Sequence, residues 1–177
     1  MRAPGVVVYL GLGANLGDRA GQLQRGVEQL QEGGVAVRRA SHLYAGAYVG
    51  PGTPQPEYWN AVVEAETALA PLMLLDFVQR LEAAAGRRAG THGLPRPLDV
   101  DVLFYGGWSI RHPRLVVPHP RLAARRFVLE PLAELGVLEL LPLPELPACL
   151  AAARQSQPLE VLPHRLLPGA ARAALPA

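Results

Sequence analysis

The spacing of apolar residues predicts a strand followed by a helix at the start of the chain. Residues 5–13, "GVVVYLGLG", are rich in β-branched residues and predict the first strand. Asn15 is expected to cap the helix that follows, with Asp18 in its first turn, and Gly33-Gly34 to end it. The apolar positions of this helix recur every three or four residues: Leu16, Ala20, Leu23, Val27 and Leu30.

The same pattern predicts two strands, a second helix and a fourth strand up to residue 105. Strands are expected over roughly 35–48 and 59–67, separated by a loop rich in Gly and Pro. Pro71 suits the first turn of the second helix, and Gly86 is expected to close it. The apolar face of this helix comprises Leu74, Leu75, Val78 and Leu81. The fourth strand is expected over 97–105, with Gly106-Gly107 forming a hairpin turn into "WSIRH".

This order, βαββαβ, predicts an α+β fold of the ferredoxin-like type, with both helices on one face of an antiparallel sheet. The segment 113–140 is expected to add a loop, a short strand ("RFVLEP") and a helix. One more helix is expected in "LPLPELPACLAAARQ" and one more short strand in "PLEVLP". We therefore expect a single domain over residues 1–163 and a flexible C-terminal tail over 164–177.

Composition narrows the class of protein. The chain has 177 residues, 50% of them hydrophobic, but no apolar run near the ~20 residues that a membrane-spanning helix needs. Its short apolar N-terminal run lacks a basic stretch and a cleavage site, so we expect a cytoplasmic protein. The single Cys149 excludes an internal disulfide and a cysteine metal cluster.

The basic residues point to an anionic ligand. All 17 are arginine, which excludes a P-loop lysine and a lysine Schiff base. Residues 80–126 hold nine arginines against three acidic residues, while the whole chain carries a formal charge of only +2. Such a local excess favours nucleic acid or a small phosphate compound, contacted through bidentate guanidinium groups.

Two carboxylates in the fourth strand are the strongest candidates for chemistry. Asp99 and Asp101 stand two positions apart and so share one face of the strand. The opposite face is expected to carry Leu98, Val100, Val102 and Phe104 into the core. Two carboxylates this close favour a cation between them, and Mg²⁺ takes one or two carboxylates plus water and phosphate oxygens. An ordinary edge strand with acids on its solvent face is the alternative; nearby Arg87, Arg88 and Arg96 favour metal-assisted phosphoryl transfer.

Other stretches carry weaker signals. The glycines of "GLGANLGDR" do not fit the spacing of a dinucleotide-binding loop, and we interpret them as a strand-to-helix turn. "RLVVPHPRLAARRF" combines His119 with arginines, which fits a phosphate site or a solvated basic face. Asn60 beside Tyr58 and Trp59 suits a flat heterocycle, or simply a turn with packed aromatic residues. Gln79 and Glu82 share a helix face, as ordinary exposed pairs also do.

Taken together, these stretches resemble the 6-hydroxymethyl-7,8-dihydropterin pyrophosphokinase family of folate synthesis. The resemblance runs, in order, through "YLGLGANLGDR", "YVGPGTPQPEYWNAVVEAET", "QRLE", "PRPLDVDVLFYGG" and "VPHPRLAARRFVLEPLAEL". It implies the ferredoxin-like fold and transfer of the β,γ-diphosphate of ATP to the pterin hydroxymethyl group, leaving AMP. It also implies two Mg²⁺ ions held by Asp99 and Asp101.

The resemblance assigns roles to further residues. Arg87 and Arg96, with the two aspartates, match the catalytic positions. Positions on the ATP side are Gln79, Glu82, Arg88, Arg114, His119 and Arg125; positions on the pterin side are Gly46, Val49, Tyr58, Asn60 and Phe127. The loop before the metal strand departs from the family: it reads "HGLPR", lacks the usual Trp, has His92 where Arg is common and is one residue shorter. Gly46 also replaces a larger residue.

Three other functions fit parts of the pattern. An RNA-binding module on the same fold would need alternating aromatic residues on central strands, which are missing. A two-carboxylate nucleotidyl transferase or cyclase would share the metal site but would not need Tyr58, Asn60 and Phe127. A regulatory sensor would not need the paired aspartates. The pyrophosphokinase interpretation accounts for both the paired aspartates and the residues Tyr58, Asn60 and Phe127. We therefore expect small-molecule substrates and no nucleic-acid, membrane or obligatory protein partner.

Overall fold

An antiparallel six-stranded sheet forms the centre of the protein. The computed structural model describes residues 5–48, 54–87 and 94–167. The order βαββαβ comprises β1 (Val6–Ala14), α1 (Arg19–Glu32), β2 (Val35–Ala40) with β3 (His42–Gly46), β4 (Tyr58–Thr67), α2 (Pro71–Ala84) and β5 (Asp99–Tyr105). The strand order is β5-β1-β4-β3-β8, with β2 also paired to β4. This is the ferredoxin-like arrangement expected from the sequence.

The second predicted strand is interrupted at Ser41. Both β2 and β3 pair with β4, at opposite ends of it. At the break, the Ser41 N–H donates to the Val62 carbonyl at 3.0 Å, and the Val62 N–H donates to the Ser41 hydroxyl at 3.0 Å. The hydroxyl takes the place of a backbone acceptor, so pairing continues across the break.

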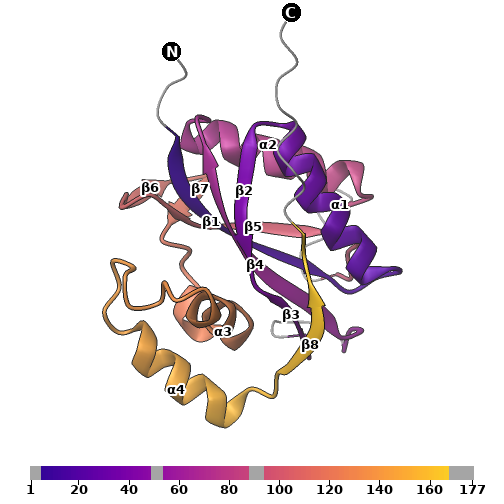
Figure 1. Cartoon of the computed structure of the whole chain (residues 1–177), viewed down its shortest axis with the longest axis vertical. Helices are drawn as coiled ribbons and strands as arrows, with labels where there is room; N and C mark the ends of the chain where they lie inside the picture. Colours follow the sequence, from indigo (N-terminus) through magenta and orange to yellow (C-terminus); the bar gives the residue numbers. More distant parts are fainter. Residues whose placement is uncertain (1–4, 49–53, 88–93, 168–177) are drawn as a thin grey trace, which may run out of the picture.

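Helices cover both faces of the sheet (Figure 1). The first face packs on α1 and α2, whose buried residues include Leu23, Val27, Leu30, Leu74 and Val78. The second face packs on α3 (Arg126–Glu134) and α4 (Leu146–Ser156) through Val128, Leu129, Leu132, Leu146 and Leu150. The two helices of the ferredoxin-like core thus share one face as expected, and the C-terminal additions cover part of the other.

The C-terminal additions differ in part from the prediction. α4 and β8 (Glu160–Arg165) form where a helix and a strand were expected. "RFVLEP" is wrong as a strand: it starts α3, because Val128, Leu129 and Leu132 bury one helical face. The predicted hairpin into "WSIRH" is also wrong. β6 (Ile110–His112) pairs with β7 (Leu115–Val117), while the His119 N–H bonds the Leu103 carbonyl on the edge of β5.

Two local predictions fail for identifiable reasons. Phe104 faces the second core rather than the first, because a β-bulge adds one residue to β5 beside Tyr9 and Leu10 and shifts the alternation. The cap of α1 is Asp18, whose Oδ1 accepts from the Gly21 N–H at 3.0 Å, and not Asn15. Asn15 is engaged elsewhere, as described below.

The packed part of the chain extends past residue 163. His164 and Arg165 belong to β8, Leu166 is buried, and the Leu167 N–H donates to Gln24 on α1 at 3.0 Å. The first residues of the expected tail therefore belong to the fold, and the rest of it, 168–177, lies outside the described residues.

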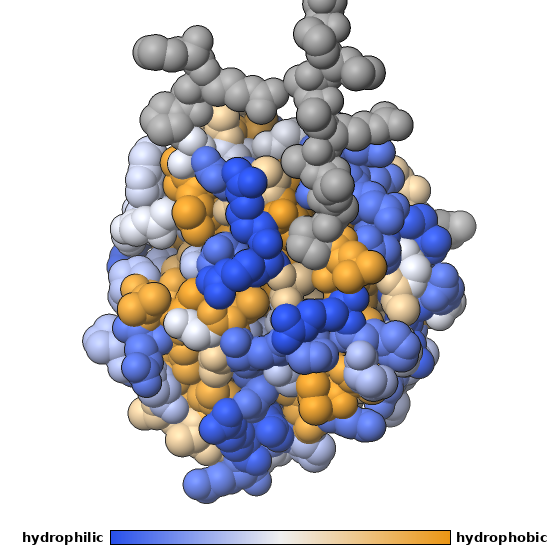
Figure 2. Space-filling view, viewed as in Figure 1, coloured by the Kyte–Doolittle hydropathy of each residue, from blue (hydrophilic) through white to orange (hydrophobic). Residues whose placement is uncertain are grey.

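No helix among the described residues is long and apolar enough to cross a membrane. Hydrophobic and hydrophilic residues are interspersed on the face in Figure 2.

Candidate active site

A cavity of about 900 Å³ opens on the second face of the sheet, beside the start of α3. Strands β1, β4 and β5 contribute Gly11, Gly13, Asn60, Asp99 and Asp101 to its lining. Arginines and aromatic residues complete the wall: Arg87, Arg96, Arg121, Arg125, Tyr48, Tyr58 and Phe127. The cavity therefore joins a carboxylate pair, a basic group and an aromatic group.

The floor of this cavity consists of two glycines on the central strand. Gly13 is the pairing partner of Asn60 on one side and of Asp99 on the other. Gly11 pairs in the same way with Val62 and Asp101. Because neither glycine has a side chain, the sheet is bare between the functional residues, and a ligand can approach its backbone.

This placement corrects our interpretation of "GLGANLGDR". Of the three glycines in this stretch, Gly17 alone, with φ +59°, has the backbone conformation of a tight turn. A Cβ at Gly13 would lie 2.9 Å from the Asn60 Oδ1, so a side chain there would have to displace the Asn60 amide. Gly11 differs, because a Cβ there would make an ordinary contact with Leu103 at 3.5 Å.

Arginines neutralise both aspartates. Asp99 accepts from Arg96 at 2.8 Å and from Arg87 at 3.1 Å through Oδ1. Asp101 accepts from Arg125 at 3.1 Å through Oδ2, and His119 Nε2 lies 3.9 Å from the same oxygen. Both aspartates are partly exposed to the cavity, as the strand spacing predicted.

The donor set suits magnesium that also binds phosphate. No group of three or more His, Cys, Asp or Glu residues is assembled as a metal site in the described ranges. Two carboxylates on one strand face are insufficient for an all-protein calcium or zinc site, but they match the partial coordination that Mg²⁺ takes when phosphates and water complete the shell. Asp99 and Asp101 thus fit a Mg²⁺–phosphate centre.

Glu82 lies beneath the carboxylate pair and also lines the larger cavity. It is 4% exposed, and its Oε1 accepts from the Val100 N–H at 2.8 Å, between the two aspartates. Its Oε2 accepts from Arg87. Burial raises the pKa of Glu82 to about 7, against the opposing effects of the Val100 N–H and Arg87. With both oxygens engaged, Glu82 positions β5 and Arg87.

The other end of the cavity is aromatic. Tyr58 stacks on Tyr48 with ring centroids 6.0 Å apart, and burial raises the pKa of Tyr58. The Arg125 guanidinium lies over the Phe127 ring, 5.4 Å from its centroid. Asn60 is buried, yet its amide has no hydrogen-bond partner among the described residues, and its polar atoms are not fully enclosed. The Asn60 amide is therefore available to form hydrogen bonds with the edge of a ligand ring.

Asn15 joins the loops on the two sides of the cavity. Its Oδ1 accepts from the Arg96 N–H at 2.8 Å, and its Nδ2 donates to Gln55 at 3.1 Å and to the Pro56 carbonyl at 3.2 Å. The residue is 2% exposed. The segment of Arg96 and the segment that leads into β4 are thereby held together.

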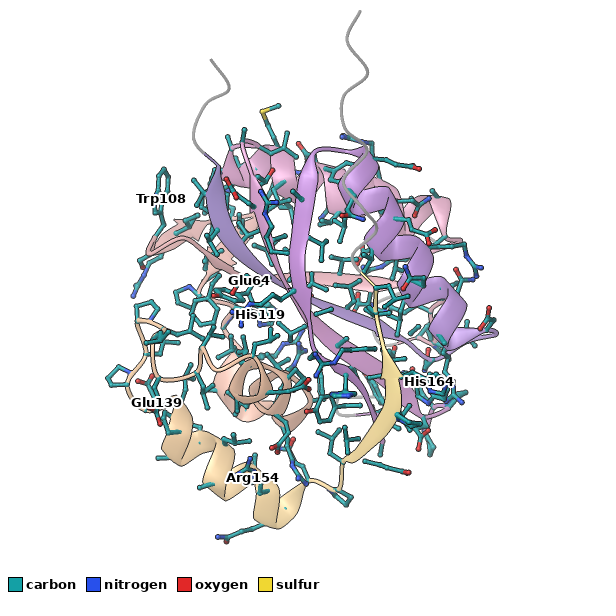
Figure 3. The ribbon with its side chains drawn as sticks, viewed as in Figure 1. Glu64, Trp108, His119, Glu139, Arg154 and His164 are labelled. Carbon is teal, nitrogen blue, oxygen red and sulfur yellow. The ribbon has the colours of Figure 1, made fainter. Side chains whose placement is uncertain are left out.

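A smaller cavity of about 260 Å³ adjoins the aspartate pair. Its lining is mainly apolar, with Leu75, Val100, Val102, Leu115 and Val116, and it also includes Asp101, Arg114 and His119. Arg114 pairs with Asp76 across its rim. His119 lies near the centre of the view in Figure 3. Burial lowers the pKa of His119, which favours the neutral imidazole near pH 7.

Most predicted site residues therefore converge on the two cavities. Gln79 and Glu82 line the larger cavity, Arg114 and His119 the smaller, and Asp101 both. Gly46 does not line either cavity; its Cα faces Leu159, and the neighbouring Ala47 and Tyr48 line the larger one instead. Val49, Arg88 and His92 lie outside the described residues. Sequence reasoning missed Tyr48 and both floor glycines as site residues, and it included Arg121 in the basic run 114–127 without giving it a role.

Comparison with known proteins agrees with this geometry. Residues 9–137 match the family model of 7,8-dihydro-6-hydroxymethylpterin-pyrophosphokinase (HPPK). The chain belongs to this family. The match runs from Tyr9, within β1, to just past the end of α3 and thus includes every described site residue named above.

Curated HPPK relatives include both single enzymes and longer proteins. The chain is 41% identical over 128 residues to the mitochondrial folate synthesis bifunctional protein of Arabidopsis thaliana, covering 72% of this chain and 23% of that one. It is 41% identical over 132 residues to the 2-amino-4-hydroxy-6-hydroxymethyldihydropteridine pyrophosphokinase of Pseudomonas aeruginosa, covering 73% of this chain and 80% of that one. The chain thus spans only about a quarter of the plant relative and about four fifths of the bacterial one.

Solved structures share the fold. A crystal structure of an HPPK-DHPS protein in complex with substrates superposes with a TM-score of 0.67 at 11% identity, covering 87% of this chain and 44% of that one. A Plasmodium falciparum HPPK-DHPS variant gives a TM-score of 0.64 at 12% identity, covering 86% and 47%. At this identity the likeness supports the HPPK fold and no more.

Proposed function

We propose that this HPPK-family chain transfers the β,γ-diphosphate of ATP to the hydroxymethyl group of 6-hydroxymethyl-7,8-dihydropterin, giving AMP and the pterin diphosphate used in folate synthesis. The observation that carries the proposal is that Asp99 and Asp101 line the larger cavity together with its aromatic–amide end and its arginines, while Asp101 also lines the smaller cavity. A transfer between a flat heterocycle and a polyphosphate needs these three parts in contact.

The pterin fits the aromatic end of the larger cavity. Tyr58 and Phe127 offer ring faces for stacking, and the Asn60 amide offers both a donor and an acceptor to the edge of the pterin ring. The hydroxymethyl group would then point toward the aspartate pair.

ATP fits the remaining space. The smaller cavity has apolar walls for a purine, and Arg114 and His119 lie at its polar side. Asp101 lines both cavities, so phosphates that extend from the smaller cavity reach the larger one beside the carboxylates. Gln79 and Arg121 line the larger cavity on this path. In this arrangement the pterin hydroxyl would attack the β-phosphorus in line with the departing AMP oxygen.

Asp99 and Asp101 are the residues that would hold Mg²⁺, and we propose two ions, as the family resemblance implies. When bound, Mg²⁺ supplies Lewis-acid stabilisation of the charge on the phosphate oxygens. Arg87, Arg96 and Arg125, which pair with the aspartates, can then turn to phosphate oxygens, because guanidinium groups bind carboxylate and phosphate in the same bidentate way. Most of the catalysis would come from such preorganised charge.

A product assay tests the proposal. Purified protein with Mg²⁺, ATP and 6-hydroxymethyl-7,8-dihydropterin should form AMP and pterin diphosphate in equal amounts, measured by anion-exchange chromatography and mass spectrometry. ADP as the product would indicate single-phosphate transfer, and release of inorganic diphosphate with an adenylylated pterin would indicate the nucleotidyl-transferase alternative. Intact ATP with folded protein would contradict the proposal.

The two floor glycines provide a matched pair of variants. Gly13→Ala should raise the KM for the pterin about tenfold, because the new methyl group displaces the Asn60 amide, which costs roughly the energy of one hydrogen bond. Gly11→Ala should change this KM by less than about threefold, since Gly11 pairs with Val62 and Asp101 rather than Asn60 and its methyl group meets Leu103 at an ordinary distance. Equal effects of the two substitutions on this KM in steady-state kinetics would show that displacement of the Asn60 amide is not the cause.

A further inference from the structure

The chain after α4 contacts the site although it lies beyond the residues that match the family model. The match ends at residue 137, whereas Gln157 follows α4 and leads into β8. Figure 1 shows this segment running from α4 along the sheet edge to β8. The side-chain amide and carbonyl of Gln157 bond the start of α3, which carries two residues of the site.

Three hydrogen bonds of Gln157 surround Arg125. The Gln157 Nε2 donates to the Ala124 carbonyl at 2.9 Å, and its Oε1 accepts from the Arg126 N–H at 2.9 Å. These are the backbone groups directly before and after Arg125. The Gln157 carbonyl also accepts from the Arg126 Nη1 at 2.7 Å. One amide thus holds both flanks of Arg125, as a neighbouring strand would.

The Arg126 N–H is also the first orphan donor of α3. Arg125 occupies the N-cap position of this helix and supplies no side-chain cap. Gln157 therefore does the work of a cap from a distant element and keeps Arg125 in an extended conformation, with φ −119° and ψ 102°. In that conformation, Arg125 bonds Asp101 at 3.1 Å and lies over Phe127.

We propose that Gln157 is a positioning residue for the diphosphate transfer, which acts by fixing Arg125 against Asp101 and the phosphate path. The expected effect of Gln157 on catalysis rests on the proposed function. The hydrogen bonds by which Gln157 fixes the backbone around Arg125 do not depend on that function. Gln157 touches no substrate position, so its effect must pass through the Ala124–Arg126 backbone. A loose Arg125 would lose the preorganisation on which charge stabilisation depends.

Gln157 is fixed by the backbone at the end of α4, and a separate ion pair joins α4 to α3. Arg154, labelled on the last turn of α4 in Figure 3, pairs with Glu130 on α3, and Glu130 also accepts from Arg126 Nε at 3.2 Å. The Gln157 N–H donates to the Ala153 carbonyl at 2.9 Å at the end of α4. Two residues later, Leu159 packs on Gly46, which fills the space left by the missing side chain there. The segment is therefore held at both ends.

Gln157→Leu and Arg154→Gln form the test pair. Leucine keeps the size of the side chain but cannot bond Ala124 or Arg126, and turnover should fall about tenfold, in the range seen when residues that support a site are removed. Arg154→Gln breaks an exposed α4–α3 ion pair and leaves the Gln157 amide in place, so turnover should change by less than about twofold. Similar losses in both variants would mean that only the docking of α4 matters and would overturn the proposal.

Two further measurements separate positioning from a general loss of stability. In an Arg125→Ala background, Gln157→Leu should cause no additional loss of turnover, because the residue through which it acts is already absent; an undiminished tenfold loss would overturn the proposal. Amide hydrogen exchange of Arg126, followed by NMR, should become about fivefold faster in Gln157→Leu, as expected for one lost hydrogen bond, and not in Arg154→Gln. If the wild-type protein forms no AMP, the proposed function fails. Separately, an unchanged rate of Arg126 amide exchange in Gln157→Leu would refute the claim that Gln157 fixes the backbone around Arg125.

Discussion

Replacing Asp99 or Asp101 by asparagine is expected to lower the rate of diphosphate transfer by roughly 10²–10³-fold, the loss found when one preorganised charge-stabilising group is removed. Asparagine keeps the shape of the side chain but not the negative charge that holds Mg²⁺. The variant also removes a carboxylate partner from guanidinium groups: Arg96 loses Asp99 and Arg87 keeps only Glu82 in one case, and Arg125 loses Asp101 in the other. The rate should be measured at saturating ATP and over a range of Mg²⁺ concentrations.

Glu66→Gln provides the control for this pair. Glu66 lies on β4 of the same sheet and forms an exposed ion pair with Arg38 at 3.0 Å, far along the strand from Asn60. Its loss should leave turnover within about twofold, because exposed ion pairs contribute little. Near-wild-type rates in both aspartate variants would refute the metal role, whereas loss of rate together with loss of the thermal unfolding transition would show only that the fold needs the carboxylates.

The sequence predicted the core elements because each obeys local rules. Period-two strands, helical stripes and glycine or proline at element ends identified β1, α1, β4, α2 and β5. The failures arise from non-local contacts. The bulge that turns Phe104 to the second face exists only through pairing of β5 with β1. α3 forms where "RFVLEP" predicted a short strand, because Val128 and Leu132 bury against a second core. Neither contact has a signal in its own segment.

The site shows the same division. Strand periodicity alone placed Asp99 and Asp101 side by side, and the arginine excess indicated a phosphate ligand. The same period-two rule places Gly11 and Gly13 on one strand face, a signal that the spacing of a dinucleotide-binding loop does not use. Asn15 was interpreted as a cap from local chemistry, although its partners Gln55, Pro56 and Arg96 are far away in sequence. The roles of Glu82 and Gln157 depend on tertiary contacts that no spacing reveals.

Asn60→Ala is expected to weaken pterin binding by roughly 10–100-fold, because a ligand edge that was hydrogen-bonded is left unpaired in a buried pocket at a cost of about 1–3 kcal/mol. The Asn60 amide is the polar group best placed for this edge: it is buried, faces the cavity and has no hydrogen-bond partner in the described part of the chain. The measurement is the dissociation constant of the pterin by fluorescence titration, together with the KM for both substrates. The KM for ATP should stay within about threefold, since Asn60 does not line the smaller cavity.

Trp59→Phe is the matched control from the adjacent position. Trp59 packs against the first core, on the opposite face of β4, and lies under the Arg19 guanidinium, 4.4 Å from the ring centroid. Its replacement should reduce stability slightly and leave pterin affinity unchanged. If Trp59→Phe weakens the pterin as much as Asn60→Ala does, the effect comes from β4 as a whole. If Asn60→Ala instead raises the KM for ATP and not for the pterin, the two substrates occupy the cavities in the reverse order, and the stacking role of Tyr58 and Phe127 passes to the adenine ring.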